Sequence, residues 1–163
     1  MKAIDLTHII TEDMPVYPGT EPPKLTPANS YERDGFKETL LSLYTHTGTH
    51  IDPPAHIFPD GRTLDEFPPE QFIGKALVID CRGIKAGGAI TLSHIERYGE
   101  KSGKADFLLF NLGWDRLWGT EAYFGDYPCL DDAALGLGKN VAQGVAHFAF
   151  GPGMALDLHV GGI

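Results

Sequence analysis

A short segment around residue 50 holds the side chains best suited to chemistry. Three histidines and one aspartate lie there within eleven residues, all at even positions (His46, His50, Asp52 and His56). On an extended strand these side chains would share one face, because successive side chains alternate. A straight strand would nevertheless hold His46 and His50 about 13 Å apart, too far for two ligands that each lie about 2 Å from one ion. We therefore expect the chain to bend at Gly48, where glycine tolerates conformations closed to other residues.

A helix is the other way to bring two histidines four residues apart to one place, as in zinc enzymes with a His-Glu-x-x-His helix. The Thr-Gly-Thr between the histidines argues against a helix here, and so do Pro53 and Pro54 just beyond Asp52. We expect a strand end that runs into a tight, proline-stiffened loop.

The residue types predict a hydrolytic metal site. His46, His50 and Asp52 would supply two imidazoles and a carboxylate and leave further positions on the ion open. This ligand set suits Zn²⁺, and Mn²⁺ is compatible with it. His56 is our candidate general acid/base, because imidazole exchanges protons near neutral pH and the prolines would hold it at a fixed offset. A polar surface loop would explain one such histidine, but four clustered side chains that can bind a metal favour a metal site.

The run from His46 to His56, His-Thr-Gly-Thr-His-Ile-Asp-Pro-Pro-Ala-His, resembles the signature of the cyclase-like metal-dependent hydrolases. That family includes the bacterial kynurenine formamidases and isatin hydrolases. The similarity extends upstream to residues 4–8 and 14–19, and downstream through residues 107–114 to about Pro128.

The resemblance implies an enzyme, a metal-dependent amidohydrolase that cleaves an amide-type C–N bond of a small aromatic substrate. N-formylkynurenine, a compound of tryptophan catabolism, is an example of such an arylformamidase substrate. It also implies a homo-oligomer, dimer or tetramer, and a substrate contact for Tyr17, in a loop where the family commonly has a tryptophan. Packing of a loop aromatic is an equally good interpretation of Tyr17.

Length and charge are those of one acidic globular domain. We treat residues 1–163 as a single domain, because 163 residues are enough for a real core. The net charge of −9 offers no basic patch, so neither nucleic acid nor an anionic membrane is expected as a partner. No segment approaches a membrane-spanning length, and Cys81 and Cys129 are too few for a disulfide framework. We expect a soluble, cytoplasmic protein in which Cys81 is a buried free thiol.

The pattern of the elements predicts an α/β fold, a mixed sheet with short helices, resembling the swivelling β/β/α fold of the family. Strands are expected at residues 3–10, 36–44, 75–81 and 107–112, the last as a central buried strand. Helices are expected from Thr91 or Ser93 to about 100, with Glu96 completing a capping box, then over 115–124 and from 131 onward. Proline-rich residues 14–27 are expected to form an ordered loop, and Trp114 is a candidate to shape the pocket.

The last thirty residues change character. From 133 to 163 only Lys139 and Asp157 are charged, and the last glutamate of the chain is Glu121. Members of the resembling family supply a late histidine and glutamate to a second metal, so we expect residues 133–163 to be divergent or truncated. One metal should then bind tightly, with Asp157 and His159 as the only late pair that could substitute. The alternative function is a non-catalytic metal-binding or assembly paralogue that has lost the second half-site.

Overall fold

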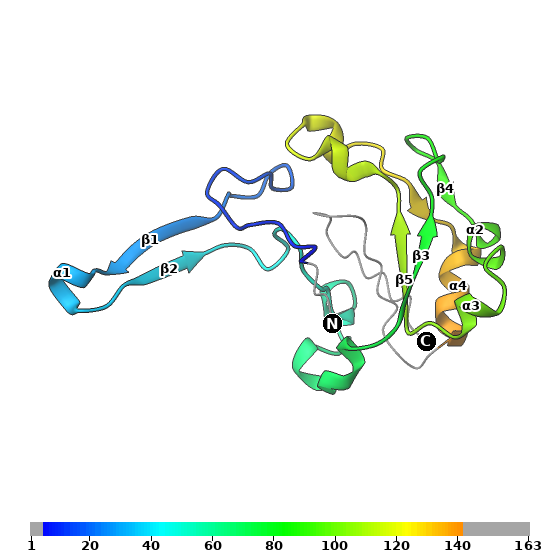
Figure 1. Ribbon diagram of the computed structural model, residues 1–163, viewed down its shortest axis with the longest axis horizontal. Helices are drawn as coiled ribbons and strands as arrows, with labels where there is room; N and C mark the ends of the chain where they lie inside the picture. The colour runs from blue at the N-terminus through cyan, green and yellow to red at the C-terminus, as the bar shows by residue number, and fades with distance from the viewer. Residues whose placement is uncertain (1–4, 142–163) are drawn as a thin grey trace.

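The computed structural model describes residues 5–141 and divides them into a projecting hairpin and a body (Figure 1). The strands are β1 (Lys24–Asn29), β2 (Glu38–Ser42), β3 (Ala76–Asp80), β4 (Ala89–Ile90), β5 (Phe107–Asn111) and β6 (Cys129–Leu130). The helices are α1 (Tyr31–Asp34), α2 (Leu92–Glu96), α3 (Glu100–Gly103) and α4 (Asp132–Val141). Five 3₁₀ turns complete the elements: η1 (Pro54–His56), η2 (Leu64–Glu66), η3 (Pro69–Phe72), η4 (Trp114–Leu117) and η5 (Glu121–Phe124).

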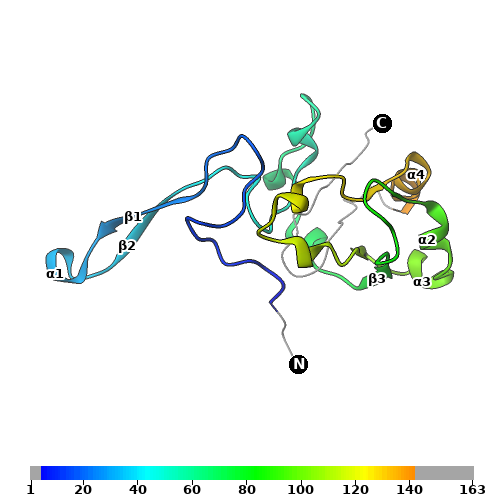
Figure 2. The same cartoon turned by 90° about the horizontal axis from the view of Figure 1, so that it is seen from above.

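The hairpin consists of β1 and β2, paired antiparallel, with α1 at its tip. Ser30 caps α1 by accepting a hydrogen bond from the backbone N–H of Arg33, and Gly35 ends the helix at a φ of 77°. Figures 1 and 2 show the hairpin extending away from the body, which leaves β2 exposed along its whole length.

The body is built on β3 and β5, which pair in parallel from Ala76 opposite Phe107 to Asp80 opposite Asn111. Both strands are short apolar runs, the pattern typical of buried parallel strands. Helices α2, α3 and α4 lie to one side of this pair (Figures 1 and 2), and β4 and β6 form a second short parallel pair. The predicted α/β class with short helices is confirmed, although the described strands form three separate pairs rather than one mixed sheet.

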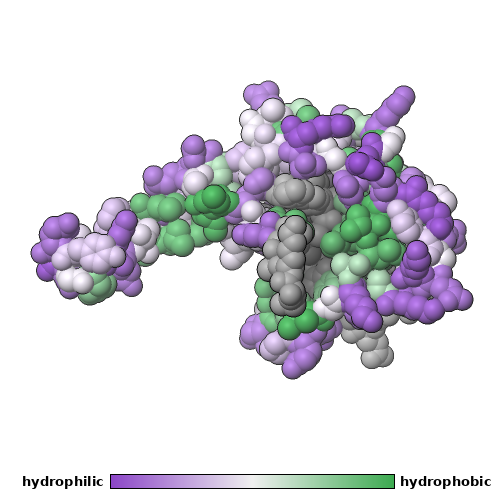
Figure 3. Space-filling view, viewed as in Figure 1, coloured by the Kyte–Doolittle hydropathy of each residue, from purple (hydrophilic) through white to green (hydrophobic). Residues whose placement is uncertain are grey.

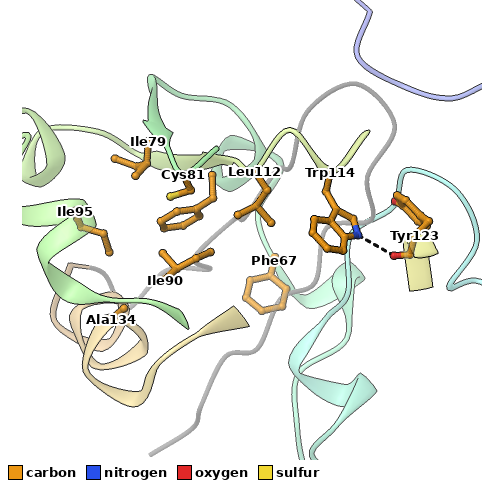
Figure 4. Packing of buried hydrophobic residues seen from close by; sticks show 10 residues of the cluster. Phe67, Ile79, Cys81, Ile90, Ile95, Leu112, Trp114, Tyr123 and Ala134 are labelled. Carbon is orange, nitrogen blue, oxygen red and sulfur yellow. Dashed lines mark hydrogen bonds between the residues drawn. The ribbon is translucent and has the colours of Figure 1, made fainter. Parts of the chain in front are cut away.

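The core lies between the β3–β5 pair and the helices (Figure 4). Ile79, Ile90 and Phe110 have no exposed surface, and Ile95 packs beside them from α2. Cys81 is a buried free thiol, as predicted, and its burial raises the pKa of the thiol. Among residues 5–141, no helix has the length and apolar character needed to cross a membrane.

Several predicted boundaries are wrong for identifiable reasons. Residues 5–10 form no strand, because no other described strand pairs with them. Thr91, one of the two predicted caps, begins α2, but the capping-box partner three residues on is His94 and not Glu96, which was predicted as the partner of Ser93. The proline-rich loop ends earlier than expected, since β1 already begins at Lys24.

Glycines interrupt two of the expected helices. A φ of 55° at Gly99 separates α2 from α3, and a φ of 84° at Gly119 separates η4 from η5. Left-handed backbone at these positions ends a helix at little cost for glycine, so each predicted helix became two short turns. The start of α4 at Asp132 agrees with the prediction, and Asp131 accepts a hydrogen bond from the N–H of Ala134 (2.8 Å).

Candidate metal centre

The histidine–aspartate segment follows β2 and bends as expected. Gly48 adopts a φ of 65°, in the left-handed region, and the chain around it forms a series of bends and no helix. An added Cβ at Gly48 would lie 3.1 Å from the Cε of Met14, so the N-terminal segment packs closely over this turn. The bend folds His50 back against His46, which a straight strand would have kept far apart.

Three candidate ligands converge on one point. His50 Nε2 lies 2.9 Å from His46 Nδ1, and His46 Nδ1 lies 3.2 Å from Asp52 Oδ1. Asp52 Oδ2 lies 3.4 Å from His50 Nε2. Ligands about 2.1 Å from a tetrahedral zinc ion stand about 3.4 Å apart, so these separations are those of a slightly contracted metal site. Among the described residues this is the one set of three metal-ligating side chains that comes together.

Hydrogen bonds fix the orientation of the ligand atoms. His50 Nδ1 donates to the carbonyl of Gly48 at 2.8 Å, which leaves the lone pair of Nε2 directed at His46 and Asp52. The carboxylate of Asp52 is buried, with only 4% of its surface exposed, and its Oδ2 has no hydrogen-bond donor among the described residues. A buried carboxylate oxygen facing two imidazole nitrogens, one of them without a proton, is an environment that a divalent cation fits.

His56 stands beside this ligand set without joining it. Its ring stacks on the ring of His46, with centroids 4.9 Å apart and planes 7° from parallel, and its side chain is exposed. The η1 turn that carries it is held by a hydrogen bond from Ala55 N–H to the carbonyl of Arg62 (3.1 Å). Gly61 is required in the turn that follows, because an added Cβ would lie 2.5 Å from the backbone of Pro54.

The aromatic residues near the site do not all lie where the sequence suggested. Trp114 belongs to the core, where its indole N–H donates to the carbonyl of Tyr123 at 3.0 Å (Figure 4). Tyr17 is exposed and meets the ring of Phe124 edge-on, with centroids 6.2 Å apart.

The structure also adds a residue that the sequence interpretation passed over. The ring of His8 stacks on Trp118, and its backbone N–H donates to the Thr49 hydroxyl (3.3 Å), next to His50 in the chain. The family resemblance of residues 4–8 includes His8, but the sequence alone did not predict this contact. The late residues His147, Asp157 and His159 lie outside the described residues.

Comparison with known proteins identifies the family. Residues 4–158 match the model of the Cyclase family, which is most of the chain. The chain belongs to the Cyclase family. Over 82 residues it is 34% identical to the kynurenine formamidase of Salinibacter ruber, covering 49% of this chain and 39% of that protein.

Solved structures agree with the family assignment. Isatin hydrolase A from Labrenzia aggregata, bound to benzyl benzoate, is 26% identical with a TM-score of 0.66, over 81% of this chain and 60% of that one. Isatin hydrolase A from Ralstonia solanacearum has the same fold, with a TM-score of 0.70 at 23% identity, over 90% of this chain and 65% of that one. This cyclase-family chain spans less than half the length of the curated relatives it matches.

Proposed function

We propose that this cyclase-family protein is an amidohydrolase of the arylformamidase type, which cleaves an amide-type C–N bond of a small aromatic substrate with activated water. The observation that carries the proposal is the convergence of His46, His50 and Asp52 around a buried carboxylate oxygen that lacks a donor. Similarity to kynurenine formamidases and to an isatin hydrolase supports the substrate class.

Zinc is the proposed metal, held by His46 Nδ1, His50 Nε2 and Asp52, with Mn²⁺ as the other candidate. The ion, when bound, supplies the Lewis acidity that activates water and polarises a carbonyl. We propose one tightly bound ion per chain, because the described residues offer one ligand set. We also propose that residues 1–163 act as one domain. Asp157 and His159 are the proposed substitutes in a second half-site, which would bind a metal ion weakly.

The protein's own groups have separate tasks. His56 is the proposed general acid/base, since its exposed ring can reach a substrate while its stacking on His46 keeps it beside the reacting group. Tyr17 is the proposed substrate contact, because it stands exposed on an aromatic surface that includes Phe124. Asp52, buried between the histidines, is the proposed carboxylate ligand, with Oδ2 3.1 Å from His46 Nδ1 and 3.4 Å from His50 Nε2.

The test measures metal content and turnover together. Protein purified without added metal is analysed by mass spectrometry, reconstituted with Zn²⁺ or Mn²⁺, and assayed on aryl formamides such as formanilide. We expect a metal-to-protein ratio close to one and turnover that a chelator removes and Zn²⁺ restores. Metal binding without turnover on any aryl amide would favour the non-catalytic paralogue. His50→Ala removes a proposed ligand and should abolish both metal binding and turnover.

We further propose that the protein is a homo-oligomer built through the hairpin and that it works in the cytoplasm. The exposed apolar surface of β2 supports the first point. The second is supported by Cys81, a buried free thiol of the kind expected in a reducing compartment.

A further inference from the structure

The N-terminal segment brings a fourth histidine, His8, to the loop that carries the candidate metal ligands. Its backbone N–H is bonded to the Thr49 hydroxyl, and Thr49 directly precedes the ligand His50. His8 is not part of the three-ligand set found among the described residues. The backbone of His8 therefore lies beside the loop that carries the ligand His50.

One ring atom of His8 lacks a partner. The imidazole lies flat on the indole of Trp118, with centroids 3.9 Å apart and planes 10° from parallel, which fixes the direction of its nitrogens. Its Nε2 is shielded from solvent and has no hydrogen-bond partner among the described residues. Buried polar atoms nearly always make a hydrogen bond, so we expect His8 Nε2 to form one with a ligand atom or a bound water.

The stacked pair continues into a wall of aromatic rings. Trp118 meets Tyr123 edge-on (4.9 Å), Tyr123 meets Phe124 edge-on (5.0 Å), and Phe124 meets the exposed Tyr17. Aromatic rings with a few polar groups are the usual composition of a small-molecule pocket, and His8 joins this row of rings to the loop that carries His50. The wall suits a flat ring, and the imidazole of His8 suits a polar substituent on that ring.

We propose that His8 is a substrate-binding residue whose Nε2–H donates a hydrogen bond to an oxygen substituent on the aromatic ring of the substrate, while Trp118 holds the imidazole in place. The inference rests on the proposed amidohydrolase activity and assigns to His8 the recognition of a carbonyl or carboxylate beside the amide. The amide would be held at the candidate metal centre, so the oxygen that His8 recognises is a second group.

The test compares two substrates in matched variants. Formanilide lacks the second oxygen, and 2-formamidobenzoate carries it as a carboxylate. His8→Phe keeps the stacking on Trp118 and removes Nε2, whereas His8→Gln puts an amide N–H close to the position of Nε2. Ile9→Ala, at an exposed neighbouring position, is the control.

We expect the wild type, Ile9→Ala and His8→Gln to prefer 2-formamidobenzoate in kcat/KM. His8→Phe should reduce that preference about 10- to 100-fold, the effect of one hydrogen bond to a charged group, with unchanged metal content. An unaltered preference in His8→Phe, or loss of metal from it, would overturn the proposal.

A binding experiment separates this inference from the activity on which it rests. Calorimetry measures the affinity of the wild type and His8→Phe for 2-aminobenzoate and for aniline, the corresponding products. A wild-type preference for 2-aminobenzoate that His8→Phe loses supports the role of His8 even if no amide is turned over. If the wild type and His8→Phe bind 2-aminobenzoate with equal affinity, or if neither protein binds it, the proposal is wrong.

Discussion

His56 is the residue whose role the geometry separates most clearly from that of its neighbours. It stacks on His46, but its nitrogens are not among the atoms that converge with His50 and Asp52. A ligand and a proton-transfer group respond differently to truncation. Removing a ligand costs metal affinity, while removing a proton-transfer group costs rate at full metal occupancy.

We therefore predict that His56→Ala lowers kcat about 10²- to 10⁴-fold, the range for losing one general acid–base group, and leaves the metal content unchanged. The assay is steady-state kinetics on the metal-reconstituted variant, alongside mass spectrometry of the same sample. Asp52→Asn is the matched comparison, since it should lose metal and activity together. If His56→Ala purifies without metal, His56 is a ligand and the division of roles is wrong.

At this scale the sequence predicted the cluster better than its surroundings. Even spacing around a glycine, followed by prolines, was enough to bring His46, His50 and Asp52 together. His8 and Trp118 are far from that segment in the chain, and only tertiary packing makes them its neighbours. Trp114 was predicted to shape the pocket because it is an aromatic residue after a strand end. In the structure it belongs to the core.

Among the elements, the turn at Gly48 has the largest influence on the site. Its φ of 65° is unfavourable for residues with a Cβ, and the Cε of Met14 would lie 3.1 Å from that atom. Met14 ends in a flexible side chain and can move aside, so the backbone conformation is the main cost. A different turn there would carry His46 and His50 apart.

Gly48→Ala is predicted to destabilise the protein by about 1–2 kcal/mol and to weaken metal affinity. The measurements are thermal denaturation of the metal-free protein and zinc titration with a chromophoric competitor. Gly35→Ala is the matched control, because Gly35 has a similar φ of 77° at the hairpin tip and open space around it. It should lose similar stability and keep normal zinc affinity. Equal zinc affinities in the two variants would show that the turn does not set the ligand geometry.

The elements that local signals define were the ones predicted from sequence. The apolar runs at β3 and β5, the second hairpin strand and the start of α4 all carry their own signal. Residues 5–10 also have a strand-like pattern, but a strand exists only where a neighbour pairs with it. The helix ends were predicted wrongly for a similar reason. A glycine can continue a helix or end it, and at Gly99 and Gly119 the folded chain adopts a positive φ that ends the helix.

At the scale of the whole molecule, the hairpin has an apolar surface that no other described residues cover. Figure 3 shows hydrophobic side chains gathered on its middle, and Leu40 and Leu41 are 62% and 49% exposed. An isolated two-stranded hairpin is at best marginally stable in water, so a further layer or strand is expected to cover it.

The two edges of the hairpin differ in their ability to accept a strand. Pro27 removes a backbone donor from β1, which protects that edge, whereas β2 contains no proline. Two copies of β2 paired antiparallel about Leu40 would set Glu38 opposite Ser42, so no like charges would meet. Such a pairing is self-complementary and closes as a two-fold dimer, which is why a second copy is the expected partner.

We predict that the protein sediments at twice the mass of one chain at micromolar concentration, and that Leu40→Lys shifts it to the mass of one chain. A lysine on this strand would face its own copy across the two-fold axis, and like charges opposite one another oppose pairing. Ile73→Lys is the matched control, because Ile73 is 79% exposed and lies between η3 and β3, outside the hairpin strands, and its replacement should leave the mass unchanged. Analytical ultracentrifugation of the three proteins decides the matter: a monomeric wild type, or a dimer that survives Leu40→Lys, would mean that β2 is not the interface.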